Sequence, residues 1–192
     1  MRHRTPPASL TLATLSNGFT LVELLIALTV GSILLSLTVP AMTSMLNTQK
    51  ASSTVNALFA GLNLARSEAI KRNARAVLCK TADGVACTSS GGWEQGWILF
   101  HDRNNNAVLD AGEEVVQQQG PASTGIRLRG NSPVANYVSY TPTGTAKLTS
   151  GAFQAGTFTL CAESAAGSNV RQIVLSGSGR ARAQKGTSRD CL

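Results

Sequence analysis

The longest apolar run of the chain occupies residues 19–39, which read FTLVELLIALTVGSILLSLTV. These 21 residues contain a single charged side chain, Glu23. A helix rises by about 1.5 Å per residue, so a segment of this length can span the hydrocarbon core of a bilayer. The pattern therefore predicts a transmembrane helix over residues 19–39.

After Pro40 the continuous apolar run gives way to an amphipathic pattern. Apolar side chains recur every three or four residues, a period typical of a helix with one buried face. This stripe consists of Val55, Leu58, Phe59, Leu62, Ala65 and Ala69. We expect one long helix over residues 19–72, bent at Pro40 because proline removes a backbone hydrogen bond. Its first half would lie in lipid and its second half would pack on a sheet.

From residue 76 onward the helical period is lost, and short apolar runs alternate with turn-forming residues. Such spacing favours antiparallel β structure. Aromatic residues make up 5% of the chain and charged residues 14%, which suits a glycine-punctuated sheet better than a helical bundle or an α/β enzyme. The predicted fold class is α+β, with the long helix packed on a β-rich head over residues 73–192. The expected strands are 76–80, 96–102, 114–119, 126–130, 137–142, 156–163 and 171–177.

The net charge of +7 is concentrated at the two ends of the chain. Residues 1–18 carry +2, residues 171–192 carry +4, and the stretch between them carries +1. A secretory signal peptide places its small residues after the apolar run, whereas here Gly18 precedes that run. Cleavage after Gly18 would remove a basic leader, residues 1–18, and leave the apolar helix on the mature protein. The basic leader would keep the N-terminal side in the cytoplasm.

Glu23 is the unusual residue of the apolar run. A carboxylate in lipid costs several kcal/mol unless it is protonated, reaches the membrane surface or pairs with a cation. Cleavage after Gly18 would create such a cation, the new amine of Phe19. In a fibre, the amine of one subunit could pair with Glu23 of the next and set their axial register.

The chain contains four cysteines, Cys79, Cys87, Cys161 and Cys191. An even number in an exported chain favours two disulfides over buried free thiols, and four cysteines allow three pairings. We favour Cys79–Cys87, because the loop between them is short and contains glycine, and Cys161–Cys191 would then follow. The cysteines form no CxxC motif and no histidine is placed to complete a zinc site, so we expect no metal centre of that kind and no cofactor.

The stretch from Gly18 to Leu25, GFTLVELL, resembles the class III signal of type IV pilins and type II secretion pseudopilins. The resemblance implies cleavage after Gly18 and N-methylation of Phe19 by a prepilin peptidase, and a role for Glu23 in assembly. It also implies a type IV pilin-like fold. Further along, the order of GWILFHD, DAGEEVV, a Tyr-Thr-Pro-x-Gly turn and IVLSGSGRAR is similar to the FimT/GspH group of minor pilins and pseudopilins.

The loop of residues 102–113, DRNNNAVLDAGE, has the spacing of an EF-hand-type calcium loop. Oxygen-bearing side chains occupy positions 1, 3, 5, 9 and 12, where they could bind Ca²⁺. Position 6 is Ala107 instead of the glycine that the sharp turn requires, and the flanking segments are expected strands. Asparagine and aspartate are also common in turns for local reasons. The candidate ligands are Asp102, Asn104, Asn106, Asp110 and Glu113.

The C-terminal segment concentrates basic side chains among glycines. If it is extended, Arg180 and Arg182 lie on one face. Guanidinium groups bind phosphates without reading bases, and the segment has no aromatic residue for base stacking. Gly179-Arg180-Ala181-Arg182 also matches the GRxR pattern of FimT-like pilins of natural transformation, which implies contact with DNA. A solvated basic terminus, or a contact with neighbouring pilins, is the alternative. The candidate DNA-binding residues are Arg180, Arg182, Lys185, Arg171 and Arg189.

The sequence argues against an enzyme, but it does not by itself identify what the protein binds. The chain lacks a Ser/His/Asp set and a phosphate-cradling loop, and its mature part would contain one histidine, His101. The leading hypothesis is a minor pilin of a type IV pilus that binds double-stranded DNA for uptake. The alternative is a GspH-like pseudopilin of the type II secretion system with a structural role at the fibre tip. Both imply a single-pass protein of the bacterial inner membrane, a periplasmic head that becomes extracellular in a pilus, and other pilins or pseudopilins as partners.

Overall fold

The computed structural model describes residues 18–162 and 169–191, without the side chains of residues 37–41, 44 and 169. The chain divides into two compact units, Met1–Pro40 and Ala41–Leu192, and helix α1 (Leu21–Arg72) contributes to both. Within the described residues, no helix is both long and apolar enough to cross a membrane. The predicted bend at Pro40 falls at the boundary between the units and stays a prediction.

The helix and strands of the second unit lie close to the predicted positions. α1 ends at Arg72, as its sequence period predicts, and seven of the strands overlap the predicted runs. The eighth strand, β8, was not among the predicted strands and contains the basic C-terminal segment. The strands are β1 (Ala76–Lys80), β2 (Trp97–His101), β3 (Val115–Gln119), β4 (Ile126–Gly130), β5 (Tyr137–Tyr140), β6 (Gly156–Ala162), β7 (Asn169–Leu175) and β8 (Ala181–Lys185).

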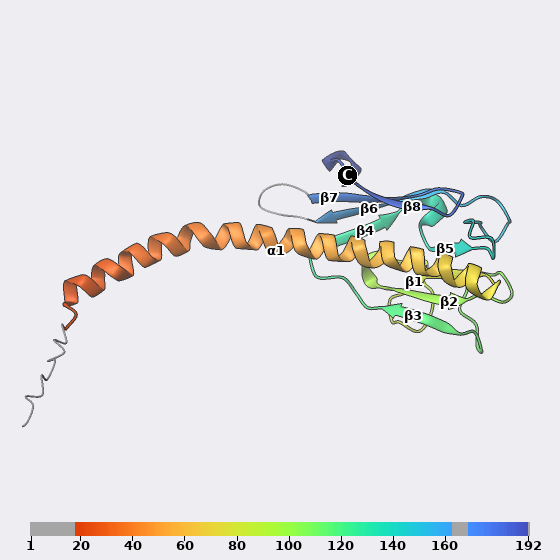
Figure 1. Ribbon diagram of the computed structural model, residues 1–192, viewed down its shortest axis with the longest axis horizontal. Coiled ribbons are helices and arrows are strands. Elements are labelled where there is room, and N and C mark those ends of the chain that lie inside the picture. Colours follow the sequence, from red (N-terminus) through yellow and green to blue (C-terminus); the bar gives the residue numbers. More distant parts are fainter. Residues whose placement is uncertain (1–17, 163–168, 192) are drawn as a thin grey trace, which may run out of the picture. The chain divides into compact units, whose positions relative to one another are not determined.

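The strands form two antiparallel sheets of four strands each (Figure 1). The first sheet has the order β3-β2-β1-β5, and the second has the order β4-β6-β7-β8. Three short 3-10 helices, η1 (Trp93–Gln95), η2 (Ser132–Val134) and η3 (Ser188–Cys191), lie between or after the strands. In this order β8 is an edge strand that pairs only with β7, because the second sheet ends there.

The main core lies where the second half of α1 meets both sheets. The helix contributes the predicted apolar stripe together with Ala51, and Phe59 is only partly buried. The helix approaches β2 closely at Gly61, where an added Cβ would lie 2.7 Å from the ring of Trp97. The sheets contribute, among others, Leu78, Leu99, Leu128, Phe158, Leu160, Ile173 and Leu175. A helix with one apolar face thus holds two sheets that could not bury their inner faces alone.

A second, smaller core covers the far face of the first sheet. It contains Val77, Cys79, Ile98 and Phe100. These residues alternate along β1 and β2 with those that face the helix, so both strands are buried on both faces. The loops that follow β1 and β2 supply the cover, and they contain the first disulfide and the calcium-like loop.

Candidate nucleic-acid interface

The basic C-terminal segment forms the second arm of a tight β-hairpin. A turn of Ser176, Gly177, Ser178 and Gly179 joins β7 to β8. The Gly179 N–H donates to the carbonyl of Ser176 at 2.9 Å, and the Ser176 N–H donates to the carbonyl of Arg180 at 3.0 Å. Arg180 therefore stands at the point where the turn enters β8, which an ordered backbone holds in place.

Gly179 is required by the geometry of this turn. Its φ of 78° lies in the left-handed region, where glycine is favoured. An added Cβ would collide with the Gly144 carbonyl oxygen and lie 3.2 Å from the ring of Tyr140. The same Gly144 carbonyl accepts a hydrogen bond of 3.0 Å from Arg66 Nε of α1. Tyr140 is fully buried below the hairpin, and that burial raises the pKa of its hydroxyl group. The first residue of the GRxR pattern is thus explained by packing.

The two faces of β8 carry different parts of the predicted DNA-binding set. Arg182 pairs with Val174, whose neighbours Ile173 and Leu175 point into the core, so Arg182 points to the outer face of the second sheet. Lys185 pairs with Arg171, and both point to the side on which α1 packs. A shallow depression there brings both of them beside Val55 and Asn56. The sequence analysis placed these residues in one DNA-binding set, but the second sheet puts Arg182 on its outer face and Arg171 and Lys185 on its inner face.

The second disulfide, Cys161–Cys191, attaches the C-terminal 3-10 helix η3 to β6. Ahead of this helix, the Gly186 N–H donates to the carbonyl of Val170 at 3.0 Å. Asp190 accepts two hydrogen bonds from Thr187, from its backbone N–H at 2.7 Å and from its hydroxyl at 2.9 Å. The backbone bond is the main reason why the pKa of Asp190 is lowered. The exposed Arg189 is therefore tethered beside the second sheet.

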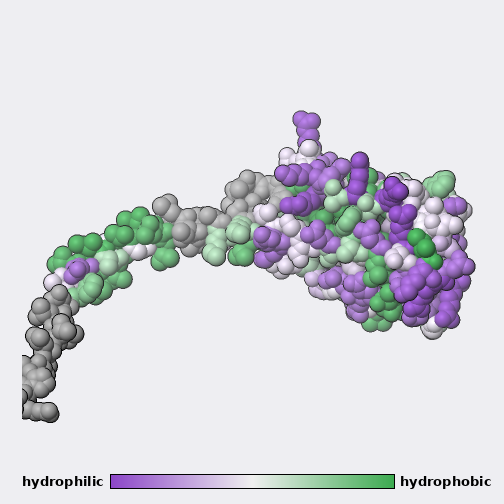
Figure 2. All heavy atoms as spheres, in the orientation of Figure 1, coloured by the Kyte–Doolittle hydropathy of each residue, from purple (hydrophilic) through white to green (hydrophobic). Residues whose placement is uncertain are grey.

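Two arginines of β4 share the outer face with Arg182, and the sequence analysis did not select them. Ile126 and Leu128 are buried, while Arg127 and Arg129 between and after them are exposed. The signal was present in the alternation Ile-Arg-Leu-Arg, which we used only to predict a strand. Arg129 Nη2 lies 3.5 Å from Glu94 Oε1. Hydrophilic side chains gather over this sheet (Figure 2).

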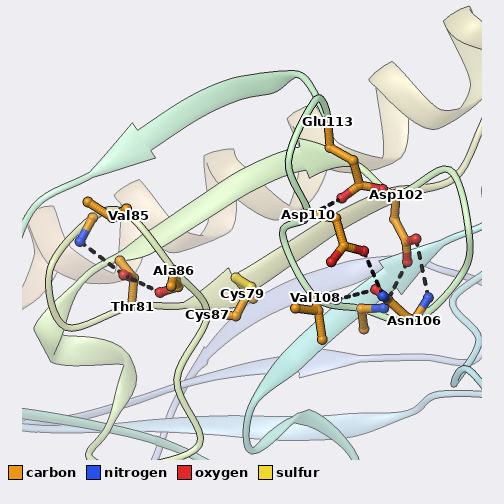
Figure 3. The surroundings of a disulfide bond; sticks show 12 residues. Cys79, Thr81, Val85, Ala86, Cys87, Asp102, Asn106, Val108, Asp110 and Glu113 are labelled. Carbon is orange, nitrogen blue, oxygen red and sulfur yellow. Dashed lines mark hydrogen bonds between the residues drawn. A yellow bond between two sulfur atoms is a disulfide. The ribbon is translucent and has the colours of Figure 1, made fainter.

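In the calcium-like loop, the carboxylate of Asp102 accepts hydrogen bonds from the backbone of the same loop. The buried Asp102 carboxylate accepts N–H groups from Asn105 at 2.6 Å, Asn106 at 3.3 Å and Ala107 at 3.0 Å (Figure 3). Ala107 adopts a φ of 58°, so the loop makes its turn without the glycine that an EF-hand has at this position.

The remaining candidate ligands have similar partners. Glu113 accepts the N–H groups of Arg103 at 2.8 Å and Asp110 at 3.1 Å. Asp110 in turn accepts bonds from the side-chain amides of Asn104 at 2.8 Å and Asn106 at 2.7 Å. Among the described residues, no three histidine, cysteine, aspartate or glutamate side chains are grouped to hold a metal ion. These side chains thus have hydrogen-bond partners within the loop, and calcium binding stays a prediction.

The first disulfide joins Cys79 and Cys87, the pairing that the short loop favours (Figure 3). Asp83 organises the loop by accepting N–H groups from Val85 at 2.8 Å and Ala86 at 3.1 Å. These bonds lower the pKa of Asp83, the one from Val85 most of all. Both favoured disulfides are present, and no described cysteine is free.

The residues of the predicted processing signal lie at the start of α1. Gly18 and Phe19 precede the helix, and the Phe19 side chain is exposed. Thr20 caps the helix by accepting the N–H of Glu23 at 3.3 Å, and Glu23 lies in the first turn. A carboxylate at this position also interacts favourably with the helix dipole. Apolar side chains cover this part of α1 (Figure 2).

The chain matches two family models. Residues 54–179 match the type II transport protein GspH, and residues 14–39 match the prokaryotic N-terminal methylation motif. No curated protein matches the sequence.

The fold is similar to solved structures of pilin-like subunits. A crystal structure of the type IV minor pilin FimU of Pseudomonas aeruginosa aligns over 74% of this chain and 92% of its own, with 20% identity and a TM-score of 0.51. A second crystal form of FimU gives 69% and 91% coverage, 20% identity and a TM-score of 0.50. The minor pseudopilin EpsH of the Vibrio cholerae type 2 secretion system gives 71% and 97% coverage, 11% identity and a TM-score of 0.48.

The family match covers more than half of the chain and fits the α+β fold described above. It indicates a structural subunit, a minor pilin or pseudopilin, in agreement with the expectation that the chain is not an enzyme. Such a subunit assembles with other pilins or pseudopilins in a type IV pilus or a type II secretion system. The chain belongs to the family of the type II transport protein GspH.

Proposed function

We propose that this minor pilin is incorporated into a type IV pilus and binds extracellular double-stranded DNA for uptake in natural transformation. Arg180 and Arg182 would contact the phosphate backbone. The observation that carries the proposal is the hairpin geometry, which holds both arginines exposed at the start of an edge strand. Among the described residues, neither side chain has an ion pair within the protein.

The mechanism is electrostatic and independent of base sequence. Residues 171–192 carry a net charge of +4, and arginine side chains release counterions when they neutralise phosphates. Phosphate contacts position a protein on a duplex but carry no sequence information. The resemblance of Gly179–Arg182 to the GRxR pattern of FimT-like pilins supports the same assignment. Arg189 can contribute from η3 beside the same sheet, whereas Arg171 and Lys185 would contribute only from the side on which α1 packs.

Replacing Arg180 and Arg182 together by glutamine should weaken DNA binding and reduce its dependence on salt. Each lost phosphate contact reduces the magnitude of the slope of log affinity against log salt by about 1, so the pair should reduce it by about 2. The measurement is fluorescence anisotropy of a short duplex of arbitrary sequence with the full chain in nonionic detergent, over a salt series.

The matched control removes the same charge elsewhere. Lys71 lies in the last turn of α1 and Arg103 in the loop after β2, both outside the second sheet, and both are exposed. Lys71→Gln with Arg103→Gln should leave the salt slope nearly unchanged. If the Arg180/Arg182 variant binds DNA no worse than this control, the assignment of these arginines is wrong.

A structural role in type II secretion is the second candidate function, and the family model named for type II transport favours it. In that role the head would contact neighbouring pseudopilins and no DNA. Deleting the gene separates the two functions, because loss of transformation with normal protein secretion supports the pilus, and the reverse supports the secretion system.

We also propose that the N-terminal signal directs processing and membrane insertion. A prepilin peptidase would cut after Gly18 and methylate Phe19, and Glu23 would pair with the amine of a neighbouring subunit. The apolar segment 19–39 would anchor the chain in the inner membrane with its head in the periplasm. The match of residues 14–39 to the methylation motif supports this, as do the exposed apolar side chains of Leu21, Val22, Leu24, Leu25, Ile26 and Leu28.

Processing can be read directly from the intact mass of the chain. The mature protein should have the mass of residues 19–192 with one added methyl group. Gly18→Val should keep the leader, because a branched side chain replaces the small residue before the cut, whereas Ser16→Ala should be processed normally. An unmodified mass for the natural chain in cells that contain the peptidase would contradict the proposal.

A further inference from the structure

The outer face of the second sheet has a defined composition that follows from its register. Residues opposite the buried positions of each strand point away from α1. Arg129 pairs with Thr159, which pairs with Gln172, which pairs with Gln184. On either side of this row lie Arg127 beside Cys161, and Thr157 beside Val174 and Arg182.

The charged residues of this face stand at its two edges. Arg127 and Arg129 belong to the edge strand β4, and Arg182 belongs to the edge strand β8. Three strand spacings of about 4.8 Å each separate these edges, so the basic groups lie on the order of 14 Å apart. Between them the paired positions carry Thr157, Thr159, Gln172 and Val174, which are uncharged. We call this surface, with the flanking Arg180 and Arg189, the basic sheet face.

The part of the basic sheet face next to β4 has depressions as well as positive charge. Two shallow depressions adjoin Arg129, and Arg127 lines one of them. Thr159 lines both, and Thr157 and Gln172 line the one farther from the disulfide. Hydroxyl and amide groups of this kind bond phosphate oxygens without reading bases.

Two carboxylates lie near these arginines, and their two negative charges reduce but do not cancel the positive charge of the five arginines of the basic sheet face. Glu94 accepts the Leu128 N–H at 2.9 Å and pairs with Arg129, whose side chain nevertheless remains 58% exposed. Asp190 lines both depressions, but its carboxylate is held by Thr187. Arg127 has no ion pair among the described residues.

We infer that the DNA-binding surface extends from the β8 hairpin across the second sheet to Arg127 and Arg129, so that the duplex crosses the strands. This inference rests on the proposed function and adds a second point of phosphate contact on β4. Two separated contacts would fix the direction of the duplex on the head, which the hairpin alone cannot do. The strand positions between the two contacts are uncharged, so the duplex would meet negative charge only beside β4, from Asp190 and Glu94 among the described residues.

Removing the β4 contact gives a direct test. In the full chain in nonionic detergent, Arg127→Gln with Arg129→Gln should weaken binding of a short duplex several-fold. The slope of log affinity against log salt should fall by about 2, one for each lost phosphate contact. Arg127→Lys with Arg129→Lys should keep most of the affinity, because lysine also binds phosphate as a point charge.

The control is again Lys71→Gln with Arg103→Gln, which lowers the net charge equally. At about 0.1 M salt the Debye length is about 10 Å, so distant charges contribute little. Arg127→Gln alone leaves the Glu94 pair intact and should lower the slope by about 1, which separates loss of contact from any change in folding.

Failure of the inference and failure of the proposed function give different results. If the natural chain binds DNA, loses binding on Arg180/Arg182 substitution, and is unaffected beyond the control by Arg127/Arg129 substitution, the β4 contact is wrong and the proposed function stands. Equal weakening by the glutamine and lysine pairs would also overturn the β4 contact, because charge would then not matter. If the natural chain does not bind the duplex at all, the proposed function itself fails.

Discussion

Replacing Trp93 by alanine should lower the free energy of unfolding by about 3–5 kcal/mol, the range for removal of a large aromatic side chain from a core. Trp93 is 2% exposed, and its ring packs edge-on against Phe158 with the ring centroids 5.2 Å apart. Its Nε1–H donates to the Val134 carbonyl at 3.0 Å. The substitution therefore removes apolar contacts, an aromatic pair and a buried hydrogen bond together.

Two further variants separate the contribution of the buried hydrogen bond from that of the aromatic ring and compare both with an exposed ring. Trp93→Phe keeps an aromatic ring but leaves the Val134 carbonyl without its donor, which should cost about 1–3 kcal/mol. Phe153→Ala removes a ring that is 70% exposed and should cost less than about 1 kcal/mol. Urea unfolding followed by circular dichroism measures all three. If Trp93→Ala and Phe153→Ala were equally stable, the packing described for η1 would be wrong.

Removing the Cys161–Cys191 disulfide should cost about 3–4 kcal/mol of unfolding free energy. The two cysteines are 30 residues apart in sequence, so the bond restricts a long loop of the unfolded chain. The substitution is Cys161→Ala with Cys191→Ala, measured by urea unfolding under non-reducing conditions. The same variant releases η3 and Arg189 from the sheet.

The Cys79–Cys87 disulfide provides the matched comparison. Its cysteines are only 8 residues apart, and the shorter loop should contribute about 2–3 kcal/mol in the unfolded chain. Reducing the natural chain should remove both contributions. A loss below about 1 kcal/mol for the Cys161/Cys191 variant would contradict the entropic account, because restricting a 30-residue loop of the unfolded chain should contribute more than that.

The candidate site was only partly predictable from sequence, for reasons that individual residues make clear. Arg180 and Arg182 could be selected from the sequence because they belong to a run of basic residues flanked by glycines. The strand that contains Arg182 was missed, since Ala181 and Ala183 are too small to mark an apolar face. Arg127 and Arg129 are about fifty residues away in sequence, and only the pairing of β4 with β6, β6 with β7 and β7 with β8 brings them onto the same surface.

In the calcium-like loop, the sequence selected candidate ligands whose arrangement only the structure shows. Its sequence has oxygen-bearing side chains at ligand spacing, and spacing alone cannot say where each oxygen points. In the folded loop, Asp102 and Glu113 accept backbone N–H groups, and Asp110 accepts the two asparagine amides. The sequence analysis counted Ala107, in place of glycine, against a sharp turn, but in the structure Ala107 adopts the positive φ that the turn needs.

The sequence by itself determined the long helix, most of the strands and the family of the chain, and it favoured the cysteine pairing that the structure has. Each of these depends on neighbours in sequence: the period of apolar residues, the spacing of turn residues, the length of a loop, or a continuous signal from Gly18 to Glu23. Only the tertiary structure decided which basic residues share a face. That depends on strand order and register, which set Arg182 on the same face as the β4 arginines and turn Arg171 and Lys185 toward the helix.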